Sequence, residues 1–160
     1  DNVLANFTLA MNCGEDGLSL LDQTLGESYV FELDPLDAAD FDGRDTLTRA
    51  EDYQAHETIV NNVADSLYFE FSPVTPIREG TRSIYEDMPY LLELLVLQED
   101  TLVVAETYSG SVDLTVVESE AGDWVVQRWK DQGDQTNPTL GALRATYALE
   151  QPASGRRRTW

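Results

Sequence analysis

The sequence predicts an α+β protein in which helices pack on one face of an antiparallel β-sheet. Two observations predict this class. Apolar residues recur at helical spacing over residues 4–63, and from Leu67 onward they alternate with the two-residue period of strands. Helices that precede a run of strands favour a layer of helices on a sheet. We expect residues 1–150 to form one domain, since a chain of this length buries about 68–70% of its unfolded surface, and residues 151–160 to form a flexible tail.

Two short helices are expected at the start of the chain. Apolar spacing predicts the first over residues 4–11 and the second over residues 18–25, and the glycines and acids of residues 12–17 break them apart. Residues 29–31 are β-formers and predict a short strand. The aspartate-rich residues 34–45 predict a loop.

A third helix is predicted from about Thr48 to residues 61–62. Thr48 and Glu51 have the capping-box spacing, in which a hydroxyl and a carboxylate each satisfy a free backbone donor, although Asp45 is an alternative start. Its inward stripe is expected to hold Ala50, Tyr53, His56, Val60 and Val63.

The second half of the chain predicts strands. Residues 67–71 alternate, and residues 75–89, with two prolines and Gly80, predict a long loop with one helical turn. Residues 90–98 are apolar and fit a strand or a buried helix, but their short length and their flanking Pro89 and acids favour a strand. Residues 101–117 predict one bent strand or two strands divided by a turn.

The chain is expected to close with a hairpin, a last strand and a short apolar element. Residues 120–123 predict a tight turn into a strand over residues 124–131, and an apolar element spans residues 140–149. Trp124 and Trp129 have opposite parity, so a regular strand places them on opposite faces of the sheet.

Composition excludes several classes of protein. Thirty Asp and Glu residues stand against ten Lys and Arg residues, giving a net charge of −20 that repels the phosphates of nucleic acid. The longest apolar run, residues 91–97, contains Glu93 and is too short to span a membrane. Cys13 is the only cysteine, so no intramolecular disulfide forms. The excess of Arg over Lys on an acidic surface fits a salt-adapted protein or a GC-rich genome equally well.

The chain resembles the nuclear transport factor 2-like superfamily, which includes ketosteroid isomerase and SnoaL-like proteins, over about residues 4–147. The resemblance rests on residues 10–31 and on the final segment, a Gly122-Asp123 turn, the strand of residues 124–131 and residues 139–144. It is nearest to small bacterial, lipoprotein-type members of uncharacterised activity. It implies a cystatin-like cone, a strongly curved antiparallel sheet around the helices with an apolar pocket at its open end. It also implies an extracytoplasmic location, with a cytoplasmic one left open, and a homodimer.

His56 and Asp131 are the candidate catalytic residues. His56 is the only histidine and lies on the predicted inward stripe, and a desolvated Asp131 has a raised pKa suited to a general base. The structural alternative for Asp131 is a hydrogen bond to a loop or an ion pair with Arg144, which is the more common role of such a residue. The structural alternative for His56 is a packed core residue, which is also the more common role. Cys13 is a weak nucleophile candidate. The predicted pocket-lining residues are Tyr29, Tyr53, His56 and Trp129.

No residue spacing predicts a metal site or a cofactor site. The aspartates of residues 40–45 lack the ordered pattern of a calcium loop, and one histidine with one cysteine does not make a zinc site. The leading interpretation is a non-catalytic, extracytoplasmic module that binds a small apolar ligand or assembles with another copy, without nucleic acid and without a membrane-spanning segment. The alternative is a small-molecule isomerase, dehydratase or cyclase that uses an acid–base residue in the pocket.

Overall fold

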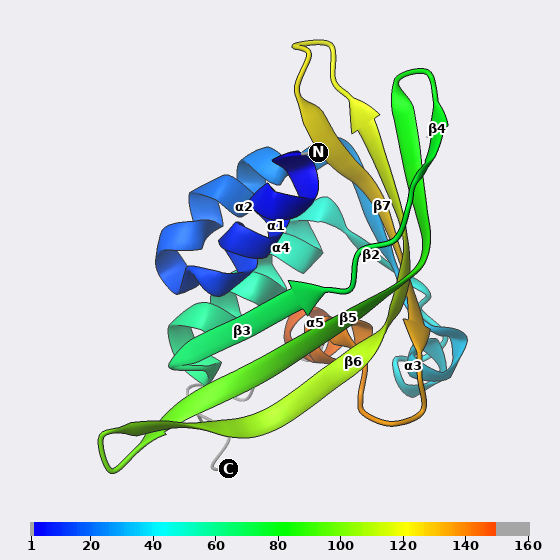
Figure 1. The fold of residues 1–160 in the computed structure, drawn as a ribbon. Helices are drawn as coiled ribbons and strands as arrows, with labels where there is room; N and C mark the ends of the chain where they lie inside the picture. Colours follow the sequence, from blue (N-terminus) through cyan, green and yellow to red (C-terminus); the bar gives the residue numbers. More distant parts are fainter. Residues whose placement is uncertain (1, 150–160) are drawn as a thin grey trace.

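The computed structural model describes residues 2–149 and confirms the α+β class, with helices enclosed by one strongly curved sheet (Figure 1). The seven-stranded sheet runs in the order β2-β1-β7-β6-β5-β3, and β4 pairs with β5. The sheet is mixed, because β1 is parallel to β7 while the remaining pairs are antiparallel. The expectation of a wholly antiparallel sheet was therefore wrong at this one pair. The predicted tail over residues 151–160 lies outside the described residues.

The opening helices match the prediction. Helix α1 spans Asn2–Asn12, a 3₁₀ turn η1 spans Gly14–Gly17, and α2 spans Leu18–Thr24. Strand β1 spans Leu25–Glu32 and is longer than the three residues predicted.

The aspartate-rich segment was predicted as a loop but contains a helix. Helix α3 spans Pro35–Asp40 and is followed by the short strand β2, Thr46–Thr48. The Asp34 side chain accepts a hydrogen bond from the Leu36 N–H, and Pro35 occupies the first turn, where its missing donor is no loss. Asp34-Pro35 thus marks a helix start inside the segment predicted as a loop.

Helix α4 spans Arg49–Thr58 and continues as a π-helical turn η2 over Ile59–Val63. The hydroxyl half of the predicted capping box is confirmed, since the Thr48 side chain accepts a hydrogen bond from the Glu51 N–H. The Glu51 carboxylate pairs with Arg44 instead of completing the box. The predicted inward face is correct in part. His56 is buried, and Tyr53, Val60 and Val63 pack half-buried against the core, but Ala50 is exposed. The buried face of α4 and η2 consists of Asp52, Ala55, His56 and Ile59. Contacts with α5 and the sheet together set this rotation.

The remaining strands form the large curved surface. Strand β3 spans Ser66–Phe71, β4 spans Ile77–Glu79, β5 spans Arg82–Gln98, β6 spans Thr101–Glu118 and β7 spans Trp124–Gly133. The loop predicted over residues 75–89 was wrong, because β4 and the start of β5 form a hairpin there. The strand predicted over residues 90–98 is confirmed as part of β5.

Strand β6 passes unbroken through Ser109-Gly110-Ser111, which settles the choice between one strand and two. Gly110 is required by close approach. A Cβ at this position would lie 2.4 Å from the Gln132 carbonyl oxygen and 2.9 Å from the Tyr90 hydroxyl. The missing side chain therefore lets β6 and the Tyr90 ring pack against each other.

A bulge in β7 changes which face its tryptophans occupy. Thr115 pairs with Arg128 and Val116 with Val126, so Gln127 is the extra residue. Trp129 is fully buried, and Trp124 is half-buried against the same core. The prediction of opposite faces was therefore wrong, because strand parity shifts by one residue across the bulge.

Helix α5, Leu140–Leu149, completes the fold and packs against α4 and β6. The core lies inside the curve of the sheet, between its inner face and helices α1, α4 and α5 (Figure 1). Within residues 2–149, no helix combines the length and apolar content needed to cross a bilayer.

A sealed polar cluster as the candidate functional site

Six polar side chains lie buried inside the curved sheet, and we call them the buried polar cluster. They are Tyr29, Asp52, His56, Tyr90, Asp131 and Arg144. Strands β1, β5 and β7 supply the tyrosines and Asp131, α4 supplies Asp52 and His56, and α5 supplies Arg144. Burial of this many ionisable groups is uncommon unless each group is paired, so their partners decide what the cluster can do.

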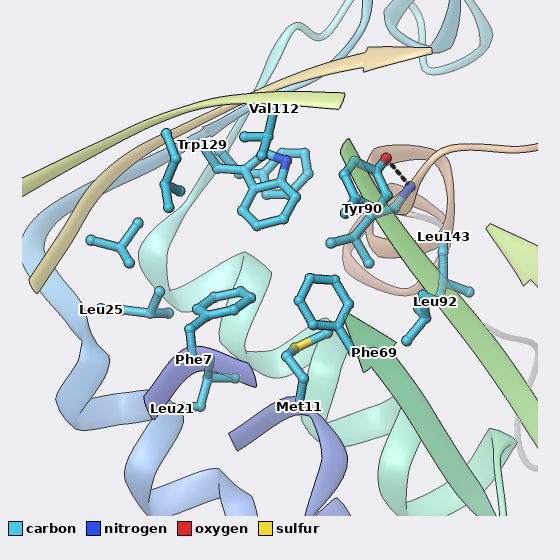
Figure 2. Packing of buried hydrophobic residues seen from close by; sticks show 14 of the residues in the cluster. Phe7, Met11, Leu21, Leu25, Phe69, Tyr90, Leu92, Val112, Trp129 and Leu143 are labelled. Atoms are coloured by element: carbon cyan, nitrogen blue, oxygen red, sulfur yellow. Dashed lines mark hydrogen bonds between the residues drawn. The ribbon is translucent and has the colours of Figure 1, made fainter. Parts of the chain in front are cut away.

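Asp131 fastens the start of α5. Its carboxylate accepts hydrogen bonds from the Tyr90 hydroxyl at 2.7 Å, from the Gly141 N–H at 2.8 Å and from the Trp129 indole N–H at 3.4 Å. The Tyr90 hydroxyl in turn accepts from the Leu140 N–H at 2.9 Å, the contact drawn in Figure 2. A Cβ at Gly141 would lie 2.6 Å from the Asp131 carboxylate, so this approach requires glycine.

The pKa of Asp131 is raised to about 6, because burial outweighs the hydrogen bonds that favour its charged form. Burial and the neighbouring Asp131 carboxylate likewise hold the pKa of Tyr90 well above its ordinary value. A carboxyl with this pKa suits a general base. Both of its oxygens, however, already accept hydrogen bonds from the protein.

A second set of contacts joins β1, α4 and α5. The Tyr29 hydroxyl donates to Asp52 Oδ2 at 2.9 Å, and Arg144 Nη1 donates to Asp52 Oδ1 at 3.2 Å and to the Asp52 carbonyl at 3.0 Å. Arg144 Nη2 contacts the Met11 sulfur at 3.2 Å. Arg144 therefore pairs with Asp52 and not with Asp131, the partner that the sequence suggested.

The sequence did not lead us to predict Asp52 as a site residue. One signal was available, because Asp52 and His56 are four residues apart and must share a helix face. Burial raises the pKa of Asp52, and Arg144 and then the Tyr29 hydrogen bond oppose that rise. Burial and the Asp52 carboxylate raise the pKa of Tyr29 well above its ordinary value. Tyr29 is therefore a neutral donor to Asp52.

His56 is fully buried, and within residues 2–149 neither of its ring nitrogens has a hydrogen-bond partner. Arg144 Nε also lacks a partner in the same part of the chain. Burial, aided by the Arg144 charge, lowers the pKa of His56 well below its usual value. His56 is thus a neutral imidazole in the core.

The structure brings together three of the four predicted pocket residues. Tyr29, His56 and Trp129 are buried inside the curve of the sheet, while Tyr53 is half-buried at the margin of the core. The space beside Trp129 is filled by aromatic rings with centroids 5.4 to 6.5 Å from the indole (Figure 2). These rings belong to Phe7, Phe31, Phe69, Phe71 and Tyr90.

The buried polar cluster does not open to solvent through the main surface hollows. Five hollows of about 190 to 620 Å³ lie over the described residues, and none is lined by a member of the cluster. Across residues 2–149, no three His, Cys, Asp or Glu side chains gather closely enough to hold a metal ion. Cys13 is exposed and lies outside the cluster.

Comparison with solved structures identifies the architecture as the nuclear transport factor 2-like fold. The Kfla4162 protein of Kribbella flavida superposes with a TM-score of 0.65 at 10% identity, over 89% of this chain and 92% of its own. A nuclear transport factor 2-like superfamily protein of Salmonella enterica serovar Typhimurium gives 0.61 at 8% identity, over 82% and 86%.

An enzyme assignment occurs among the similar structures. A Novosphingobium aromaticivorans protein, provisionally assigned as a scytalone dehydratase, superposes with a TM-score of 0.57 at 11% identity, over 88% of this chain and 89% of its own. No protein-family model matches the chain, and no curated protein matches it. At these identities the likeness establishes the fold and leaves the activity to be argued from the site.

Proposed function

We propose that the chain is a non-catalytic assembly module that associates through the outer face of its sheet. The observation that carries the proposal is an exposed apolar patch, defined as Tyr68, Leu97, Leu102 and Val104, whose side chains are 45 to 56% exposed. Leu97 pairs with Leu102, and Val104 pairs with Leu95 on the same face of β5 and β6. Tyr68 lies on the neighbouring strand β3, opposite Glu93.

The sealed interior supports a non-catalytic role. Asp52 is held by Arg144 and Tyr29, and Asp131 by Tyr90, Trp129 and Gly141. A substrate would have to displace packed aromatic rings and these hydrogen bonds before reaching either carboxylate. The outer face needs no such rearrangement.

The occupant that we propose for the patch is a second copy of the chain. Its side chains expose roughly 350 Å² together, within the range of the largest patches on ordinary monomers, which are often functional. That area supplies the apolar centre of an interface that buries about 800 Å² per partner. Two equal patches related by a twofold axis are complementary to each other, whereas a partner chosen by charge would need a basic surface.

Sedimentation velocity at several protein concentrations tests the proposal. We expect a dimer that dissociates in the double variant Leu97→Gln, Leu102→Gln and persists in the matched control Leu9→Gln, Leu36→Gln, which changes two exposed leucines outside the patch. Because each copy carries a charge of −20, dimerisation should strengthen between about 0.1 and 1 M NaCl. A chain that stays monomeric at both salt concentrations, or a control that dissociates equally, would overturn the proposal.

A second candidate function is acid–base catalysis on a small apolar substrate, and the unpartnered ring nitrogens of His56 favour it. His56 and Asp131 would exchange protons with the substrate, while Tyr29 and Trp129 would line the opened site. Isomerisation of an unsaturated cyclic ketone is the assay. Activity lost in both His56→Gln and Asp131→Asn, with folding retained, would establish this function in place of the first.

The extracytoplasmic location is part of the leading proposal, and fractionation of cells that express the complete gene tests it.

A further inference from the structure

A hollow of about 550 Å³ lies between α1, α2 and the turn that joins β6 to β7. Its volume is that of an ordinary small-molecule site. A neighbouring hollow of about 560 Å³ shares Gln23 and Asp123 with it. That second hollow is lined by Val117 and Val125, which alternate with the buried Val116 and Val126 and therefore lie on the other face of the sheet. Neither hollow touches the buried polar cluster or the apolar patch.

The side chains that line the first hollow combine one large ring with several neutral hydrogen-bonding groups. Trp124 is half-buried, and the indole N–H has no acceptor among residues 2–149. Asn6 and Gln23 expose their amides, and each amide both donates and accepts. The buried Thr24 hydroxyl donates to the Leu20 carbonyl at 2.7 Å, which leaves its oxygen as an acceptor.

The chemistry of the side chains that line the hollow limits the chemical class of its ligand. The net charge of −20 disfavours phosphates and other anions. The amides, the hydroxyl and the Asp123 carboxylate are poorly matched to a wholly apolar molecule, because they would lose their hydrogen bonds to water. A flat indole beside several donors and acceptors suits a molecule with a C–H face and a rim of hydroxyl groups.

We propose that the first hollow binds a neutral, polyhydroxylated ligand of the sugar class. The Trp124 ring packs against the C–H face of a sugar ring, while Asn6, Gln23 and Asp123 hydrogen-bond its hydroxyl groups. The site is independent of the dimer proposed above, because no residue of the apolar patch lines this hollow.

Saturation-transfer NMR and indole fluorescence with three neutral trisaccharides, maltotriose, cellotriose and N-acetylchitotriose, test the proposal. We expect at least one to bind with a Kd of about 1 mM or lower. Trp124→Ala should weaken binding about tenfold or more, and Gln23→Ala should also weaken it. Gln54→Ala is the matched control, because Gln54 is an exposed glutamine on α4 that lines neither hollow.

Two further arms keep the test decisive. Should Trp124→Ala fail to fold, the exposed Asn6→Ala and Gln23→Ala variants carry the measurement in its place. Spermidine serves as the cation probe, and binding of spermidine without any sugar, weakening as NaCl is added, would replace the proposal with a cation site. No binding of any of the three trisaccharides, or equal loss in Gln54→Ala, would overturn it.

Discussion

Asp131 is a buried carboxyl that has hydrogen-bond donors but, among residues 2–149, no cation as a direct partner. Tyr90, Trp129 and the backbone of Gly141 all donate to it. Dipoles of this kind offset only part of the cost of burying a charge. The part of this cost that the hydrogen bonds do not offset raises the pKa of Asp131 to about 6. The folded protein therefore holds this proton more tightly than the unfolded chain does.

The ionisation of Asp131 should make the free energy of unfolding depend on pH. Because the folded pKa of Asp131 is raised from 3.8 to about 6, its contribution is complete below about pH 4 and is lost as the pH rises through 6. The difference of 2.2 pKa units between those two values corresponds to at most about 3 kcal/mol. Urea unfolding from pH 4 to 8 measures it. Asp131→Asn should reduce this fall, and the raised pKa of Asp52 leaves a part of the same sign.

The contribution of His56 to the free energy of unfolding has the opposite pH dependence, so His56 serves as an internal control. Its folded pKa is lowered, so its contribution is present above the ordinary value of 6.5 and is lost as the pH falls. Compared with the unmodified protein, the stability of Asp131→Asn should therefore fall less as the pH rises, and that of His56→Leu should fall more. An unchanged profile in Asp131→Asn would show that this carboxyl is not the group responsible.

At the scale of elements, α1 protects an edge of the sheet. Strand β3 pairs with β5 on one side only. On the other side, the Asn12 amide donates to the Phe69 carbonyl at 2.8 Å and accepts from the Phe69 N–H at 2.6 Å. A third bond from the same amide to the Thr8 carbonyl at 2.9 Å holds it in place. Asn12 thus imitates the partner strand that an exposed edge would otherwise recruit.

Asn12→Ala should destabilise the fold by about 1–3 kcal/mol, because it leaves the Phe69 backbone groups unpaired. It should also raise the rate of β-rich aggregation, since β3 then presents a free edge of apolar alternating residues. Thermal unfolding and light scattering measure the two effects. Asn6→Ala is the control, an exposed asparagine on the same helix. Equal melting temperatures and equal aggregation rates in Asn12→Ala and Asn6→Ala would contradict a protective role for Asn12.

At the scale of the whole molecule, thirty acidic residues stand against ten basic ones. Described ion pairs such as Arg128 with Glu32 and Arg44 with Glu51 engage few of these acids, and exposed pairs of this kind contribute little to stability. The surplus carboxylates repel one another over distances that salt shortens from about 10 Å at 0.1 M to about 3 Å at 1 M. Self-repulsion is therefore a property of the entire surface.

The melting temperature should consequently rise as NaCl is increased from about 0.1 to 1 M at neutral pH. Differential scanning calorimetry measures it. At about pH 4, where many carboxylates are protonated, the same salt increase should have a much smaller effect. A melting temperature that does not respond to salt at neutral pH would contradict the expectation and favour a GC-rich genome over salt adaptation as the origin of the composition.

Local spacing was sufficient for the class of fold and for most of its elements. The opening helices, the Thr48 cap of α4 and the strand over residues 90–98 follow from contacts among residues close in the chain, which is why periodicity and capping reveal them. His56 and Asp131 were likewise found from residue type and position. These features depend on hydrogen bonds and side-chain directions that a short segment sets by itself.

Only the tertiary structure decided how those elements face each other. The Asp52–Arg144 pair joins residues 92 positions apart, the Gln127 bulge moves Trp124 to the inner face, and α4 is rotated so that Asp52 is buried and Tyr53 is not. Likewise, the filling of the interior depends on the summed volumes of side chains from helices and strands along the whole described chain. Register, helix rotation and packing are set by contacts between distant segments, and no window of sequence contains both partners of such a contact.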